Sequence, residues 1–215
     1  MEDVQLECWS SEVELLLKSW SEKATCFRWL HARCEKKYRS RYYSFSIPVI
    51  ILSTLTGAAN VGLSSYIPEE KQSTAQAIVG AVNIFAGILS TLQTFLKVCE
   101  HMESHRASSV AWSKLGRAIC IELALKPCRR SNCHDFLSIS RSEYDRLIEQ
   151  SPCISDDVIN TFKNRFKSYK ISKPSITNGL DTCNIYKEKV DDAVIKKEMK
   201  ELSGEEEVDD QVEIP

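Results

Sequence analysis

Charged residues are missing from two long stretches of this 215-residue chain. None occurs between Arg41 and Glu69, and none between Lys71 and Lys97. A helix without charge around its whole circumference is not an ordinary water-exposed surface helix. Roughly 20 residues are enough to cross about 30 Å of hydrocarbon, and each run is that long. Because backbone groups cannot stay unpaired in lipid, residues 42–97 are predicted to form a transmembrane helical hairpin.

Enzymatic motifs are also missing. The sequence contains no phosphate-binding loop, no nucleophile elbow and no dinucleotide-binding turn. His101 and His105 are four residues apart, but their sequence H-M-E-S-H is not the zinc-protease pattern, and we expect them to pack against a neighbouring helix. Cys128, Cys133 and His134 match no common zinc spacing. We therefore predict a non-enzymatic protein with no catalytic residue, cofactor or metal. A membrane-anchored enzyme that uses His101 and His105 is the weakest alternative.

The charge balance excludes one class of partner. The net charge is −2, and the sequence has neither a basic stripe nor a nucleic-acid-binding motif, so no nucleic acid is expected to bind. The nine cysteines are odd in number and irregularly spaced, which favours free thiols in a reducing compartment over a disulfide framework. No apolar core precedes residue 42, which predicts that the first span acts as an uncleaved signal anchor.

Small and polar residues are frequent inside the two charge-free runs. Ala58 and Gly62 are four apart, as are Ala77 and Ala81, a spacing that places small side chains on one helix face. Such residues are typical of helices that pack on other helices or line water, although a buried hairpin inside a soluble bundle is the alternative. The predicted helix-packing or pore-lining residues are Gly57, Ala58, Asn60, Gly62, Ala77, Gly80, Ala81, Asn83 and Gly87.

Two helical arms are expected to flank the hairpin. Residues 1–41 carry an apolar stripe with steps of three and four, which is typical of an amphipathic helix. Its members are Trp9, Val13, Leu16, Trp20, Ala24, Phe27, Leu30, Cys34 and Tyr38. The second arm, residues 98–127, is predicted to continue the second span without interruption. Its stripe consists of Cys99, Met102, Arg106, Val110, Leu115, Ile119 and Leu123. The two arms leave the hairpin on the same side, so we expect them to pair, either within one chain or between neighbouring chains.

The boundary between arms and hairpin has the composition of a membrane interface. Cationic and aromatic side chains are enriched at that depth. The residues in question are Lys36, Lys37, Arg39, Arg41, Tyr42, Tyr43 and Lys97. Pro48 predicts a break or kink where the first arm becomes a span. The excess of positive charge on this side predicts a two-pass protein with both termini in the cytoplasm.

The remainder of the chain is predicted as short helices at 128–170 and a flexible acidic tail at 171–215. Residues 128–138 are expected to be a loop, and Ser140 with Glu143 resembles a capping box at a helix start. Ser155 is expected to cap a second helix. The end of the chain, ELSGEEEVDDQVEIP, has the composition of a solvated, disordered block.

Several segments resemble the two-transmembrane proteins called SLATT, most closely the versions encoded by large DNA viruses. The similar segments are residues 27–31 (FRWLH), 47–57 (IPVIILSTLTG), 79–93 (VGAVNIFAGILSTLQ) and 103–106 (ESHR), with Trp112 after them. The resemblance covers roughly residues 20–127. It implies a helical arm, two spans and a second arm, and for bacterial relatives a role as oligomeric, pore-forming effectors controlled by nucleotide-sensing partners. No sensor domain is attached here, so any such trigger would be a separate protein.

These features predict an all-α integral membrane protein. The leading hypothesis is a homo-oligomer in a lipid bilayer that forms a pore. The alternative is a structural protein of a viral internal membrane, which ties a host-derived or virion membrane to the capsid or to other viral proteins.

Overall fold

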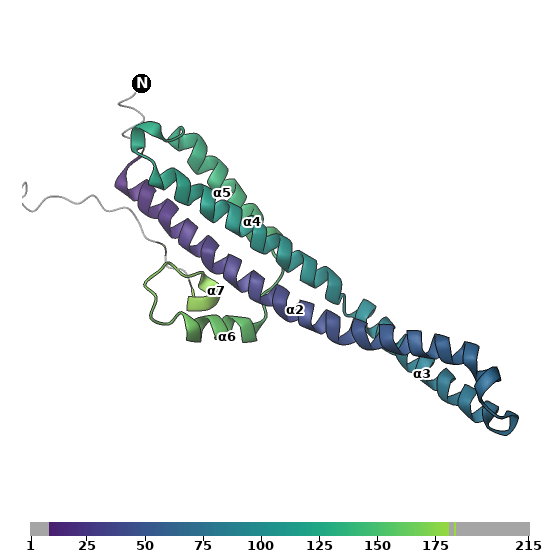
Figure 1. Cartoon of the computed structure of the whole chain (residues 1–215). Coiled ribbons are helices and arrows are strands. Elements are labelled where there is room, and N and C mark those ends of the chain that lie inside the picture. The colour runs from purple at the N-terminus through teal and green to yellow at the C-terminus, as the bar shows by residue number, and fades with distance from the viewer. Residues whose placement is uncertain (1–8, 181–182, 184–215) are drawn as a thin grey trace, which may run out of the picture. The chain divides into compact units, whose positions relative to one another are not determined.

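The computed structural model describes residues 9–180 and 183, and every regular element in that part of the chain is a helix. The elements are α2 (Ser11–Tyr66), α3 (Glu69–Phe95), α4 (Val98–Ala124), the 3-10 turn η1 (Pro127–Arg129), α5 (Cys133–Gln150), α6 (Asp156–Arg165) and α7 (Ser175–Asn178). All of them belong to one compact unit that ends at Leu180 (Figure 1). The predicted tail from 171 thus begins inside this unit, and its acidic end lies outside the described residues.

Helix α2 is 56 residues long and contains both the first arm and the first charge-free run. Ser10 caps it, since its hydroxyl accepts a hydrogen bond from the backbone N–H of Val13. The helix continues through Pro48, so the expected break there is wrong. Proline removes one backbone donor, but its fixed φ is itself helical, and the flanking turns keep their hydrogen bonds.

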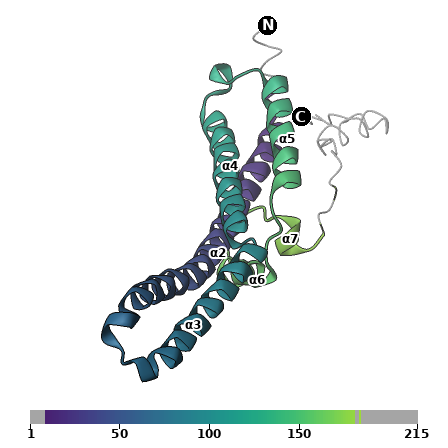
Figure 2. The same cartoon turned by 90° about the vertical axis from the view of Figure 1, so that its right-hand side faces the viewer.

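The two arms pack against each other, as the stripes predicted. The first half of α2 runs antiparallel to α4, and this is the most extensive helix contact in the unit (Figures 1 and 2). Phe27 stacks on Trp112 with ring centroids 4.5 Å apart. Gly116 allows the backbones to approach closely, because a Cβ there would lie 3.4 Å from that of Ala24. The shared core consists of Leu17, Ala24, Phe27, Leu30, Cys34, Trp112, Leu115 and Ile119.

Individual positions in the predicted stripes need correction. Leu17 is fully buried, whereas Leu16 is 43% exposed. On α4, Val110 is 51% exposed and Trp112, which was outside the predicted stripe, is completely buried. The predicted stripe on α4 is rotated around the helix axis relative to the buried face, because His105, Ser108 and Trp112 are the residues that α4 turns towards α2. That face contains polar residues, which an apolar pattern does not detect.

The second arm does not continue α3 without interruption. Lys97 separates α3 from α4 with φ 48° and ψ 35°, a left-handed conformation that costs a non-glycine residue about 1–2 kcal/mol. α4 ends at Ala124, two residues before Lys126-Pro127, as predicted.

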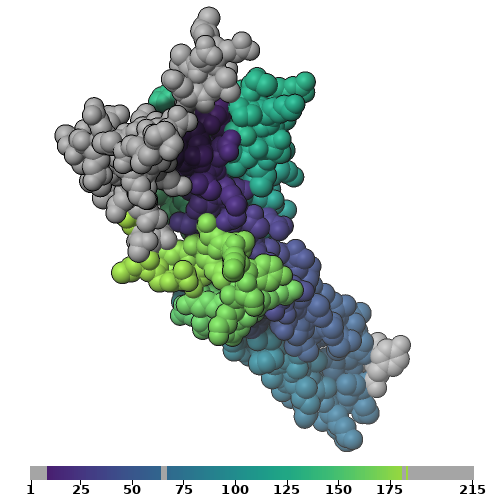
Figure 3. Space-filling model, turned by 90° about the vertical axis from the view of Figure 1, so that its left-hand side faces the viewer, coloured from purple at the N-terminus to yellow at the C-terminus, as the bar shows by residue number. Residues whose placement is uncertain are grey.

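The region after Pro127 also differs from expectation. Helix α5 begins at Cys133, capped by Asn132, so residues 133–138 are helical and Ser140 is a buried residue inside the helix. The capping-box pattern was misleading because Asn132 is an equally good cap earlier in the chain. Helix α6 begins after Ser155, so Ser155 is at the predicted N-cap position, but its side chain makes no capping hydrogen bond. α6 and α7 lie over α2, where the Trp29 ring packs edge-on against Phe162 and Phe166 (Figure 3).

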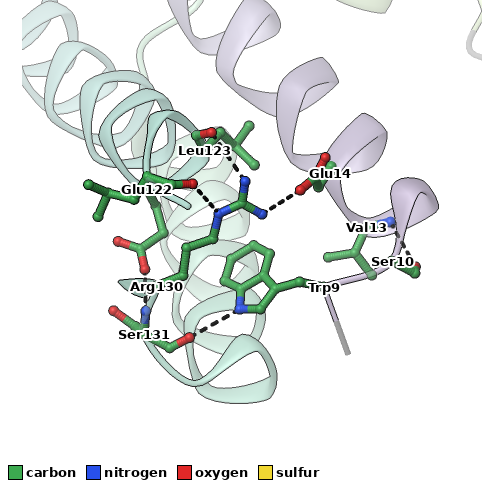
Figure 4. Close-up of polar contacts among 9 residues, drawn as sticks. Trp9, Ser10, Val13, Glu14, Glu122, Leu123, Arg130 and Ser131 are labelled. Carbon is green, nitrogen blue, oxygen red and sulfur yellow. Dashed lines mark hydrogen bonds and ion pairs between the residues drawn. The ribbon is translucent and has the colours of Figure 1, made fainter. Parts of the chain in front are cut away.

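Arg130 joins the far ends of the arms. Its guanidinium pairs with Glu14 of α2, donates to the carbonyl oxygens of Leu123 and Leu125 at the end of α4, and lies over the Trp9 ring (Figure 4). The Trp9 indole in turn donates to the carbonyl of Ser131. The side chain of Arg130 is 6% exposed, so this ion pair is shielded from water on the arginine side.

We expect Trp112→Ala to destabilise the paired arms. It removes a fully buried ring that stacks on Phe27 and donates to Ser151 Oγ, and such truncations cost about 3–5 kcal/mol. Unfolding of the full-length protein in detergent micelles measures the effect. Because the contacts lie within one chain, the loss should not depend on protein concentration. Ile121→Ala, on the exposed face of α4, is the control, and equal effects of the two variants would contradict this packing.

Candidate functional site: the exposed apolar helix pair and its base

The second half of α2 and all of α3 form an antiparallel pair that the rest of the described chain leaves uncovered (Figures 1 and 2). We call residues 42–66 of α2 together with α3 the apolar pair. By length and composition, the two helices that form it could each cross a membrane. Only 11% and 6% of their most apolar windows are buried. The exposed large side chains are Tyr43, Ile47, Ile50, Ile51, Leu55, Val61, Ile78, Ile84, Phe85, Ile88, Leu92 and Phe95.

The seam of the apolar pair combines small apolar groups with hydrogen bonds. Thr56 is buried, and its hydroxyl lies 2.6 Å from the side-chain oxygen of Asn83. Nearer the base, Ser46 and Gln93 exchange hydrogen bonds of 3.0 and 3.2 Å. Ala86 and Leu63 are the buried apolar members. Two polar bridges therefore fix how α2 and α3 lie against each other.

Most of the predicted small residues lie outside this seam. Gly57, Gly80 and Gly87 have open space where a Cβ would be, with no atom within 4 Å. Ala58, Asn60, Ala77 and Ala81 are exposed, and Gly62 is half-buried. Asn83 is the member that contacts the opposite helix. The chain thus leaves most of these small groups on the outer surface of the apolar pair.

The predicted interface residues surround the base of the apolar pair, where it joins the arms. Most of the cations there have partners: Lys37 pairs with Asp157 of α6, Arg39 with Glu35, and Lys97 with Glu100 at 3.3 Å. Lys36 is exposed, and the rings of Tyr42 and Tyr43 lie 5.7 Å apart. Arg41 lies over the ring of Tyr38 and forms no ion pair within the described part of the chain.

A buried histidine pair lies between the arms just beyond this base. Nδ1 of His31 on α2 and Nδ1 of His105 on α4 are 2.9 Å apart, and both side chains are almost completely buried. Tyr38 stacks on His105 and on His101, so His101 faces the same cluster from its edge. No group of three or more metal-ligating side chains occurs within residues 9–180 or at 183.

Burial, together with the smaller effect of the neighbouring His105, lowers the pKa of His31 to about 4. Burial and the nearby His101 likewise lower the pKa of His105 to about 4. One neutral ring can donate from Nδ1 to the other, which accepts at Nδ1. Nε2 of His31 is buried without a hydrogen-bond partner, so a proton placed there would have no acceptor. The pair is therefore neutral near pH 7.

Sequence reasoning named His105 but missed its partner His31 as a packing residue, and it missed Thr56 and Gln93. All three are polar residues within predicted helices, and the local sequence does not distinguish them from polar residues that face away from the contact. Comparison of the chain with protein-family models, curated proteins and solved structures returned no match.

We expect the paired arms to lose stability in acid. A histidine with a folded-state pKa of about 4 and an unfolded value near 6.5 binds more protons when unfolded between those two pH values. The free energy of unfolding is thus at its full value above pH 6.5 and falls, by an amount on the order of a few kcal/mol for the pair, as the pH approaches 4. Denaturant unfolding of the full-length protein at a series of pH values measures this slope.

The double variant His31→Gln/His105→Gln should flatten the slope, because it removes both titrating groups from the interface. His134→Gln, at an exposed position on α5, is the matched control and should leave it unchanged. An unchanged slope in the double variant would show that other groups cause the acid sensitivity.

Proposed function

We propose that the protein is a two-pass membrane protein whose apolar pair crosses a lipid bilayer and associates with further copies of itself. The observation that carries this proposal is the exposed apolar surface of the apolar pair, which has no charged residue in 42–66 or 72–95 and which no other part of the described chain covers. Soluble monomers rarely expose contiguous apolar surface on this scale, and bilayer insertion would remove it from water.

The dimensions support this assignment. Helix α3 has 27 residues and is therefore about 40 Å long, which exceeds the roughly 30 Å of a hydrocarbon core. The first turn of α3, directly after the connection from α2, carries Glu69, Glu70 and Lys71, whereas the base carries the cluster of lysines and arginines. The positive-inside rule then places the base and both arms in the cytoplasm.

Self-association is supported by the outer surface of the apolar pair. Asn60 is exposed there, and an amide in hydrocarbon is costly unless it finds a partner. Gly57, Gly80 and Gly87 provide sites where another helix could approach closely. An assembly that brings these residues together around an axis would line a pore with them, and ion flux into proteoliposomes is the measurement for that version of the proposal.

The first test is topological and uses the native cysteines as its control. Cys99, Cys120, Cys128 and Cys153 are exposed, and all lie on the arms or on the segments packed against them. A membrane-impermeant maleimide applied to intact cells should therefore leave the native protein unlabelled and label Glu69→Cys. All exposed cysteines should react after permeabilisation. Labelling of the native protein in intact cells would contradict this topology, and loss of the protein from membranes in alkaline carbonate would contradict insertion.

The second test addresses self-association. A Cβ added at Gly87 would have open space around it, with no atom of the neighbouring helix within 4 Å, so Gly87→Leu should leave the fold of the single chain intact. We expect it to reduce cross-linked oligomers in membranes several-fold, because it prevents close approach of a second helix. Ala107→Leu adds similar bulk on the exposed side of α4 and is the control. Equal cross-linking of both variants and the native protein would exclude this face as the contact.

A further inference from the structure

A hollow of about 560 Å³ lies at the base of the apolar pair, beside the interruption between α3 and α4. Tyr38, Arg41 and Phe45 line it from α2, and Leu96, Val98 and His101 line it from the other side. Figures 1 and 2 show this region as the point where α4 leaves the line of α3. The hollow therefore lies where the charge-free stretch of α2 meets the basic one.

The lining changes in character along α2. Towards the arms it contains the phenol of Tyr38 and the guanidinium of Arg41, with the His101 imidazole stacked on Tyr38 at a centroid distance of 5.2 Å. Ser40 and Ser44 add hydroxyl groups. Towards the apolar pair it contains Phe45 and Leu96, both hydrocarbon. A ligand that fits this order has a polar head on the arm side and an apolar body on the hairpin side.

The polar end of the hollow is lined by a positive charge and by no negative one. No carboxylate lines the hollow. Three other cations of the base are already paired with Asp157, Glu35 and Glu100, whereas Arg41 forms no ion pair among the residues described. Its guanidinium lies 5.8 Å from the centroid of the Tyr38 ring, and both residues line the hollow. A planar donor without a carboxylate partner suits a phosphate group.

We propose that this hollow, the base pocket, binds the phosphate headgroup of an anionic phospholipid, with Arg41 and the serine hydroxyls on the phosphate and an acyl chain along Phe45 and Leu96. The inference rests on the proposed function, because only insertion of the apolar pair brings the pocket to headgroup depth. The inference goes beyond the proposed function in two respects. It names the class of ligand, and it assigns Arg41 a binding role that insertion of the apolar pair alone does not require.

Native mass spectrometry of the full-length protein released from mixed-lipid nanodiscs tests the proposal. We expect retained phosphatidylglycerol in preference to phosphatidylcholine. Arg41→Gln should weaken retention about tenfold or more, since a charge-assisted hydrogen bond contributes roughly 1.5–3 kcal/mol. Arg39→Gln removes an equal charge two residues away. Arg39 is paired with Glu35 and does not line the pocket, so this variant should retain the lipid. Equal losses in both variants would show general surface attraction and overturn the pocket.

A second variant separates shape from charge. Ser44→Phe fills the hollow and keeps Arg41, so it should also release the lipid, and undiminished retention would overturn the proposal. Inorganic phosphate added in excess should compete poorly, because it lacks the acyl chain; full competition by phosphate would reassign the pocket to a free anion. Carbonate-resistant insertion of Arg41→Gln separates the two proposals: loss of lipid selectivity with insertion intact contradicts only the base pocket, whereas failure of the native protein to insert contradicts the proposed function.

Discussion

The continuity of α2 is the constraint on which the rest of the structure depends. This one helix of 56 residues packs against α4 and α6 along its first half and against α3 along its second half. A continuous helix transmits a rotation or tilt of one end to the other, because every turn is hydrogen-bonded to the next. The segment that runs antiparallel to α2, formed by α3 and then α4, is interrupted at Lys97. The arms and the apolar pair are therefore joined by an unbroken helix in α2 and by an interrupted one at the α3–α4 junction.

Different interactions hold the two halves of α2 against their partner helices. Between the arms, aromatic rings and branched side chains are buried in a contiguous core that includes Phe27, Trp112 and Ile119, and removal of this area from water drives the packing. Between α2 and α3 the buried groups are few, and Thr56–Asn83 and Ser46–Gln93 bridge the helices. Lipid chains are as apolar as leucine, so a seam in a bilayer gains from close packing and hydrogen bonds instead of hydrophobic burial. The contrast in composition matches an aqueous environment for the arms and a hydrocarbon one for the pair.

The sequence predicted where the helices lie along the chain better than which face of each helix is buried. Helix existence, the two charge-free runs and the end of α4 before Pro127 follow from strong local signals: charge, periodicity and proline. The phase of α4 was wrong because its buried face includes His105 and Ser108, and a hydrophobic pattern assigns such residues to solvent. The start of α5 was wrong because two capping signals competed, and only packing chose Asn132 over Ser140. Pairings such as His31–His105 join positions 74 residues apart, which no local pattern in one sequence contains.

Departures from local rules concentrate at the base. Within the described residues, Lys97 is the single non-glycine position with positive φ, and Arg41 forms no ion pair although Lys37, Arg39 and Lys97 of the same base do. A strained lysine persists only when its surroundings hold it there, and here the interruption lets α4 turn its histidine face onto α2. An unpaired arginine beside an apolar surface is unfavourable in a dry protein interior but favourable at a bilayer surface, where phosphates are the nearest counter-charges. The strain and the unpaired charge therefore both fit the proposal that the base of the apolar pair lies at the boundary between water and lipid.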